Sequence, residues 1–148
     1  MGNVFKIQSV ATDKVLDVPG GQLGNGVVIQ QWDDLGGTNQ KWEMRLIGVA
    51  FGKDVYTIAS LASKLVLDVP NGDLSDQVKI QQFASNGGTN QMWYKIAVGD
   101  GSYKIESVSS QKVLDVPAAA PDNGVQIQQF HDNGGANQHW RFIEVSPE

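Results

Sequence analysis

The sequence predicts an all-β protein built from three copies of one four-stranded unit. The 17 glycines among its 148 residues indicate many tight turns, which are typical of short strands rather than of helices. One segment, 16–42, returns twice along the chain, at 67–93 and at 114–140. No window carries an amphipathic helical period long enough to cover a sheet face. We therefore expect strands and turns throughout.

Three motifs define the repeat and occur in the same order, without gaps, in every copy. Leu-Asp-Val-Pro comes first, Val-x-Ile-Gln-Gln followed by an aromatic residue comes second, and Gly-Gly-x-Asn-Gln-x-Trp comes third. The aspartates of the first motif, Asp17, Asp68 and Asp115, are 51 and 47 residues apart. This difference arises because the joint 45–54 is four residues longer than the second joint. Such a period is typical of units that bury their apolar faces against one another.

Each unit is expected to hold four strands separated by turns. In the first copy, alternating apolar and polar residues between turn formers place the strands at 4–10, 15–18, 27–32 and 42–47. We expect one domain, 1–148, with repeats at roughly 4–47, 55–98 and 102–145. Three such units fit a β-trefoil or a small propeller, and propellers typically have about four or more blades. We therefore predict a β-trefoil with pseudo-threefold symmetry.

Composition argues against several classes of function. The net charge is −5 and the lysines and arginines are scattered singly, so no basic stripe is present for nucleic acid or for an anionic membrane. The absence of cysteine excludes disulfides, cysteine nucleophiles and thiolate metal sites. No apolar run approaches the ~20 residues of a membrane span, and 1–6 does not resemble a signal peptide. We expect a soluble chain without membrane insertion, whose compartment stays open.

Strand parity predicts a set of side chains that face away from the core. In Leu16-Asp17-Val18 the apolar residues point one way, so Asp17 points to the other face. The same rule places Gln30 and Trp32 opposite their apolar neighbour. The corresponding residues in the other copies are Asp68, Gln81, Phe83, Asp115, Gln128 and Phe130. An aromatic ring packs against the apolar face of a sugar, and a carboxylate and an amide bind its hydroxyls. This pattern predicts three sugar sites.

The Gln-x-Trp pairs are expected to be mainly structural. Trp42 opens a strand with apolar residues such as Met44, so we place it in the core, with the Gln40 amide holding the preceding turn. Trp93 and Trp140 are its counterparts. Asn39 has the opposite parity and lies at the end of the Gly-Gly turn, where it can reach the site. The glycine pairs themselves suggest a backbone with positive φ.

Together these motifs resemble the ricin B-type lectin family, whose hallmark is a threefold Gln-x-Trp repeat. The resemblance covers roughly 4–143. It implies a β-trefoil with up to three sugar pockets for galactose or N-acetylgalactosamine, working without metal or other cofactor. By position it implies these sugar-binding residues: Asp17, Gln30, Trp32, Asn39 and Gln40; Asp68, Gln81, Phe83, Asn90 and Gln91; Asp115, Gln128, Phe130, Asn137 and Gln138.

The chain departs from the family in ways that make its three sites unequal. Many bacterial members carry disulfides inside each repeat, and this chain has none. Two stacking positions hold phenylalanine, which offers a smaller contact area than tryptophan. The loops 20–26, 71–77 and 118–124 share little sequence: Gln77 replaces a glycine of the other copies, and Pro121 stiffens the third loop. We expect the first pocket, with Trp32, to be the strongest.

Other interpretations of the same residues stay open. The aspartates could cap backbone amides as a folding requirement. The isolated His131 and His139 are expected to be surface residues, and Asp33-Asp34 and 73–76 to be solvated turns rather than calcium loops.

The overall function also has alternatives. Nucleophile motifs are absent and each pocket has only one aspartate, which favours binding over catalysis. The alternatives to a lectin are a carbohydrate-binding module of a xylan- or galactan-degrading enzyme and a trefoil protease inhibitor. The glycan epitope, the number of active sites and the oligomeric state are not determined by the sequence.

Overall fold

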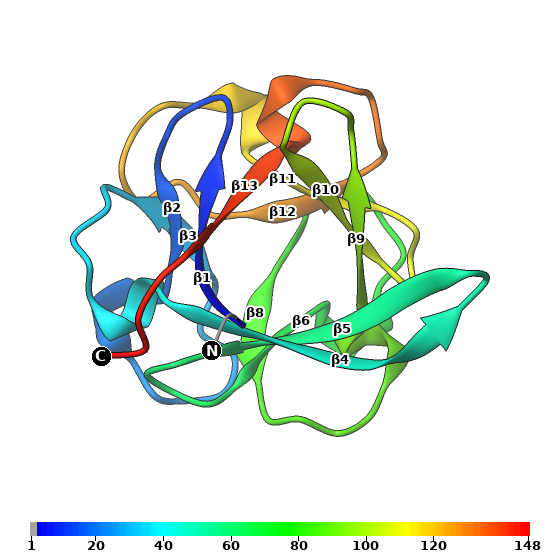
Figure 1. Cartoon of the computed structure of the whole chain (residues 1–148), viewed down its shortest axis with the longest axis horizontal. Helices are drawn as coiled ribbons and strands as arrows, with labels where there is room; N and C mark the ends of the chain where they lie inside the picture. The colour runs from blue at the N-terminus through cyan, green and yellow to red at the C-terminus, as the bar shows by residue number, and fades with distance from the viewer. Residues whose placement is uncertain (1–2) are drawn as a thin grey trace.

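The computed structural model describes residues 3–148 as thirteen strands and six single-turn 3-10 helices (Figure 1). The expected domain, 1–148, includes residues 1–2, which lie outside this description. The strands are β1 (Val4–Ser9), β2 (Val15–Asp17), β3 (Gln30–Trp32), β4 (Trp42–Ala50), β5 (Lys53–Ser60), β6 (Val66–Asp68), β7 (Val78–Lys79), β8 (Gln81–Phe83), β9 (Trp93–Ala97), β10 (Tyr103–Ser107), β11 (Val113–Asp115), β12 (Gln128–Phe130) and β13 (Trp140–Glu144). The described part of the chain holds no helix with the length and apolar character needed to cross a membrane.

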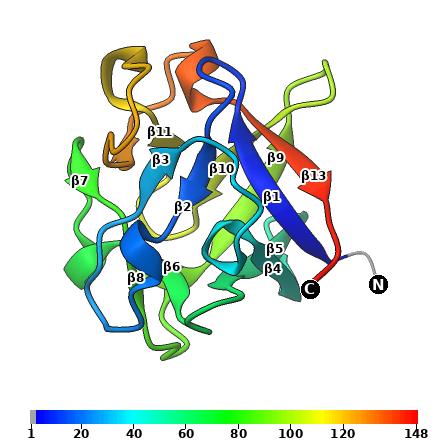
Figure 2. The same ribbon diagram turned by 90° about the vertical axis from the view of Figure 1, so that its left-hand side faces the viewer.

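Six strands close into an antiparallel barrel. Following the pairing, β1 joins β4, β4 joins β5, β5 joins β9, β9 joins β10, β10 joins β13, and β13 returns to β1. Figure 2 shows the closing pair, with β1 in blue beside β13 in red. Six of the remaining seven strands form one short pair per repeat, β2–β3, β6–β8 and β11–β12, and the two-residue β7 pairs with β12. This arrangement confirms the predicted β-trefoil.

Three isoleucines tie the short pairs together around the pseudo-threefold axis. The backbone N–H of Ile29 donates to the carbonyl of Ile80 at 2.9 Å, Ile80 donates to Ile127 at 3.0 Å, and Ile127 donates back to Ile29 at 2.9 Å. All three side chains are fully buried. Because each copy supplies one donor and one acceptor, the ring closes only when three repeats are present.

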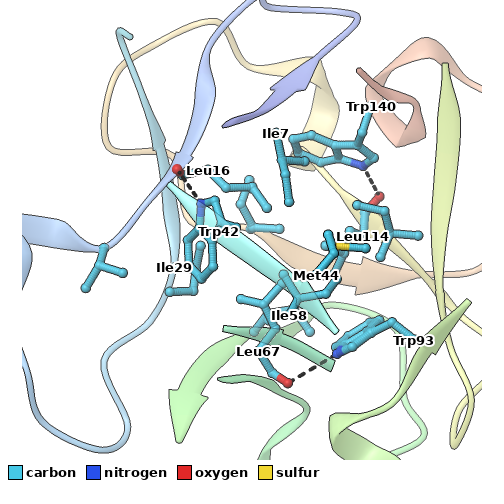
Figure 3. Close-up of a cluster of buried hydrophobic side chains, with 14 of the residues drawn as sticks. Ile7, Leu16, Ile29, Trp42, Met44, Ile58, Leu67, Trp93, Leu114 and Trp140 are labelled. Carbon is cyan, nitrogen blue, oxygen red and sulfur yellow. Dashed lines mark hydrogen bonds between the residues drawn. The ribbon is translucent and has the colours of Figure 1, made fainter. Parts of the chain in front are cut away.

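The core tryptophans are placed as the sequence predicts. Trp42, Trp93 and Trp140 are buried, and each indole N–H donates to a leucine carbonyl of the same repeat (Figure 3). The distance from Trp42 Nε1 to the carbonyl oxygen of Leu16 is 3.1 Å, and the two equivalent distances are 3.2 Å. A buried indole therefore fills the core while its N–H satisfies a backbone acceptor.

The first joint forms a long hairpin rather than a loop. The strand expected at 42–47 continues as β4 to Ala50 and returns as β5, turning at Phe51 and Gly52 with φ of 51° and 76°. In Figure 1 this hairpin projects from the body of the molecule. The extra residues therefore extend two barrel strands and leave Phe51 exposed at the tip. The expected strand at 27–32 is shorter, and only Gln30–Trp32 is assigned.

Candidate sugar-binding site

Each repeat builds a polar cluster around the aspartate of its Leu-Asp-Val-Pro motif. In the first repeat, the register of β2 and β3 pairs Asp17 with Gln30, so both side chains emerge on the same face. Gln30 Nε2 donates to Asp17 Oδ1 at 2.9 Å. Gln40 Nε2 donates to Asp17 Oδ2 at 2.9 Å, and Asn39 Nδ2 approaches the same oxygen at 3.4 Å. Both carboxylate oxygens thus face amide donors.

The other two repeats reproduce this cluster almost atom for atom. Gln81 and Gln128 donate to Asp68 and Asp115 at 3.0 Å in both cases. Gln91 and Gln138 do so at 2.9 and 3.0 Å, and Asn90 and Asn137 at 3.4 Å. The pseudo-threefold symmetry predicted from the sequence therefore extends to the side chains.

The aspartates are far less open than the parity argument alone suggested. Asp17 is 4% exposed, and Asp68 and Asp115 are each 2% exposed, because the amides cover them. Within residues 3–148, the hydrogen bonds that these carboxylates accept come from side-chain amides, not from backbone N–H groups. The interpretation of the aspartates as backbone caps is therefore wrong. A carboxylate oxygen has two lone pairs, so Oδ1, which accepts one amide, can also accept a hydroxyl.

The glutamines of the Gln-x-Trp pairs lie behind the aspartates rather than in the pocket wall. Gln40 is buried, and its Oε1 accepts the backbone N–H of Leu35 at 2.8 Å. Its Nε2 also donates to the carbonyl of Asp33 at 2.8 Å. Gln91 and Gln138 make the equivalent bonds in their repeats. These side chains fix the turn and orient the carboxylate, so they position the site instead of forming its surface.

The turn before each of these glutamines contains a glycine pair whose two residues differ in backbone conformation. The first glycine, such as Gly36 with φ of 75°, adopts the expected positive φ. The second, Gly37, has an ordinary φ of −75°. A Cβ on Gly37 would lie 2.6 Å from Asn39 Oδ1, so a side chain at this position would displace the Asn39 amide. The expectation of positive φ thus holds for the first glycine only.

A hollow opens beside each cluster, with the aromatic residue as one wall. The first, about 270 Å³, is lined by Asp17, Gly20, Gln30, Trp32, Leu35 and Asn39. The second, about 180 Å³, is lined by Asp68, Asn71, Gln81, Phe83, Asn86 and Asn90. The third, about 360 Å³, is lined by Gln77, Asp115, Pro117, Ala118, Gln128, Phe130, Asn133 and Asn137. The structure therefore brings together the aspartate, outward glutamine, aromatic residue and asparagine of every repeat.

One wall position was not singled out in the sequence. Leu35, Asn86 and Asn133 occupy it in the first, second and third hollows. Each directly precedes the Gly-Gly pair, inside a stretch expected to be only a turn. Two features of the sequence could have indicated this position. It directly precedes the Gly-Gly motif in all three copies, and its residue changes from apolar to polar between repeats.

The other polar side chains near the surface pair with one another. Asp33 contacts Lys14 at 2.8 Å, and this hydrogen bond holds the pKa of the Asp33 carboxyl below its usual value. Asp76 contacts the ring of the exposed His131 at 2.9 Å, while His139 is half-buried. Over residues 3–148, no group of three or more histidine or acidic side chains is arranged to hold a metal ion.

Comparison with protein families identifies the domain. The model of the family described as "Ricin-type beta-trefoil lectin domain-like" matches residues 1–83, 50–130 and 89–148, which together span the chain. The chain belongs to this ricin-type β-trefoil lectin family. Lectin domains bind carbohydrates, so the chain is a domain of a carbohydrate-binding family.

Solved structures of related domains agree with this assignment. The lectin domain superposes on ThreeFoil, a designed threefold-symmetric protein, with a TM-score of 0.92 and 32% identity, covering 96% of this chain and 99% of that one. It matches an exo-β-1,3-galactanase from Clostridium thermocellum with a TM-score of 0.91 and 36% identity, covering 97% of this chain but 30% of the galactanase. The Rhizoctonia solani agglutinin shares the fold, with a TM-score of 0.87, 23% identity, and coverage of 98% and 96%. A search of curated sequences finds no match.

Proposed function

We propose that this lectin domain binds galactose- or N-acetylgalactosamine-terminated glycans in its three hollows, without a metal ion. The observation that carries the proposal is the triplicate placement of a positioned aspartate beside an aromatic wall. The ring of Trp32, Phe83 or Phe130 would stack on the apolar face of the sugar. The aspartate would accept its hydroxyls, and the outward glutamine and the asparagine would add further polar contacts.

The galactose class is supported by one of the comparisons. The exo-β-1,3-galactanase is named for a galactose polymer, and its matching segment is 36% identical to this chain. A single shallow pocket of this kind binds a monosaccharide with a dissociation constant on the order of 1 mM, about −4 kcal/mol. Three such pockets around the pseudo-threefold axis raise avidity on a surface dense in glycans.

A second candidate function follows from the same comparison. The chain corresponds to 30% of the galactanase, so the domain also fits the role of a binding module that holds an enzyme on galactan. A module of this type prefers the polymer to short galactosides. Comparing retention on insoluble galactan and on xylan with binding of methyl β-galactoside distinguishes a polymer-binding module from a lectin for terminal sugars.

A glycan array tests the main proposal. The matched pair of variants is the triple change Trp32→Ala, Phe83→Ala and Phe130→Ala, and the control Phe51→Ala at the exposed hairpin tip. We expect binding to galactose-terminated glycans that the triple variant loses and the control keeps, with both variants folded by circular dichroism. Binding confined to mannose would contradict the galactose class, and a folded protein that binds no glycan would contradict the lectin function.

A further inference from the structure

Each hollow is bordered by a loop that belongs to the preceding repeat. The fully buried Gln129 of the third repeat donates from Nε2 to the carbonyls of Asp73 and Ser75 in the second repeat, at 2.8 and 2.7 Å. Gln82 holds the loop of the first repeat in the same way, and Gln31 holds the loop of the third. The start of each loop, at Gly20, Asn71 or Ala118, lines the hollow of its own repeat, whereas the far end of the loop reaches the next hollow.

The residue at that far end stands against the aromatic wall. Gly26, Gln77 and Gly124 occupy this position with φ of 86°, 70° and 88°. Their backbone N–H groups donate to the backbone carbonyls of Gln82, Gln129 and Gln31 at 2.8, 2.8 and 2.9 Å. A Cβ at Gly124 would lie 3.7 Å from Trp32 Cζ3 and 3.9 Å from Gln30 Oε1. At position 77 a side chain is present, and Gln77 lines the third hollow with Phe130 and Gln128.

The third hollow differs from the other two in size and lining. It is about 360 Å³, against about 270 and 180 Å³ for the other two, and its lining includes Gln77 from the neighbouring repeat. Gln128 is buried at 6% exposure, whereas Gln30 and Gln81 are half-buried. A non-glycine residue in the left-handed region is disfavoured. The fold thus imposes this conformation on all three loops, and only here does a side chain extend from it.

The loop that carries Gln77 is also anchored by an acid–histidine contact specific to the third pocket. Asp76 accepts the backbone N–H of His131 at 2.8 Å and contacts the His131 ring at 2.9 Å. Lys112 lies 3.5 Å from the same carboxylate. The His131 ring in turn lies against the Phe130 ring, with centroids 4.4 Å apart. In the other loops Asn25 and Asn123 replace this aspartate. Gln77 is therefore held next to the stacking residue.

We propose that Gln77 makes the third pocket an extended site that selects a galactose-ended disaccharide, while the first pocket takes a single terminal sugar. The primary amide of Gln77 both donates and accepts, so it suits the hydroxyls of a second ring that extends beyond Phe130. This inference rests on the proposed function, because it assumes that the hollows bind sugar. It predicts a preference for lactose over methyl β-galactoside at the third pocket alone.

Calorimetric titration of single-pocket variants tests the proposal. Trp32→Ala with Phe83→Ala leaves the third pocket, and Phe83→Ala with Phe130→Ala leaves the first. We expect the third pocket to favour lactose by about 3- to 10-fold, the range of one net hydrogen bond. Adding Gln77→Gly or Gln77→Ala should remove this preference. Gly124→Gln, which places an amide beside Trp32, should create it at the first pocket.

The outcomes separate failure of the inference from failure of the proposed function. If the third pocket binds sugar but Gln77→Gly and Gln77→Ala leave the lactose preference unchanged, the inference is wrong and the lectin function stands. A preference that Gln77→Gly removes and Gln77→Ala retains would indicate loop mobility rather than the amide, and would also overturn it. Sugar binding at the first pocket alone overturns the inference, and a folded wild-type chain that binds neither sugar overturns both.

Discussion

Gln40 and Asp17 form the hydrogen bond that joins the Gln-x-Trp motif to the carboxylate of its repeat, with 2.9 Å between Nε2 and Oδ2. The same amide accepts the N–H of Leu35 through Oε1 and donates to the carbonyl of Asp33. One buried side chain thus satisfies two backbone groups and one side of the carboxylate. The motif that marks the family is therefore a support for the pocket.

Replacing this glutamine should lower the stability of the folded domain. Gln40→Leu leaves the Leu35 N–H and the Asp33 carbonyl without partners, so we expect a loss of about 1–3 kcal/mol in the free energy of unfolding. Urea denaturation measures it. Gln126→Leu, at an exposed position, is the control and should change stability by less than about 0.5 kcal/mol. Equal effects of the two substitutions would contradict the positioning role.

The two classes of tryptophan should respond differently to the same substitution. Trp42→Phe removes the indole N–H that serves the carbonyl of Leu16, and we expect a destabilisation of about 1–3 kcal/mol. Trp32→Phe introduces the phenylalanine that the other two repeats have at the pocket wall. The free energy of unfolding of this variant should therefore stay within about 0.5 kcal/mol of that of the parent protein. Thermal unfolding of both variants checks this difference, and a larger loss from Trp32→Phe would contradict the assignment.

A side chain at the second glycine of the pair should displace the neighbouring asparagine. In Gly37→Ala the new Cβ meets Asn39 Oδ1 at 2.6 Å, which forces the asparagine away from the first pocket. We expect a cost of about 1–3 kcal/mol from this overpacking and weaker sugar binding at the first pocket alone. Gly48→Ala, with nothing within 4 Å of the added atom, is the matched control. Chemical denaturation and titration of the single-pocket protein report both effects.

The contact between Asp76 and His131 should make the second loop sensitive to acid. The hydrogen bond from His131 holds the pKa of the Asp76 carboxyl below its ordinary 3.8. A carboxylate with a lowered pKa stabilises the folded loop fully above that value, and the contribution is lost as the pH falls through the lowered pKa. The groups that face it are His131 and Lys112.

NMR relaxation of residues 73–77 between pH 6 and pH 3 measures this effect. We expect the loop to become more mobile at the acid end in the parent protein. Asp76→Asn, which matches the asparagines at 25 and 123, should remove that dependence. An identical pH profile in the variant would show that another group controls the loop.

Strand periodicity accounts for how much of the site was predictable. Side chains alternate between the two faces of a strand, so the sequence alone places Leu16 in the core and Asp17 on the opposite face. It likewise places Trp42 in the core and Trp32 on the pocket side. The covering of Asp17 by amides was not predictable, because it depends on where η2 (Thr38–Gln40) folds back. The partner of a loop is also non-local: nothing within 70–77 indicates that Gln77 lies beside Phe130. The extended β4–β5 hairpin was not predictable either, because the four additional residues of this joint have no counterpart in the other repeats.

Each repeat holds the loop of the preceding repeat and donates an isoleucine hydrogen bond to the next one. This cycle of contacts determines how such a chain can be divided. A fragment of two repeats would leave one glutamine without the carbonyls it binds and one loop without its holder, besides an open isoleucine ring. Each repeat supplies one holding glutamine, one loop and one isoleucine, so the cycle of contacts is complete with three repeats and incomplete with two. Three copies are therefore the smallest number that satisfies this architecture, whether they lie on one chain or on separate chains.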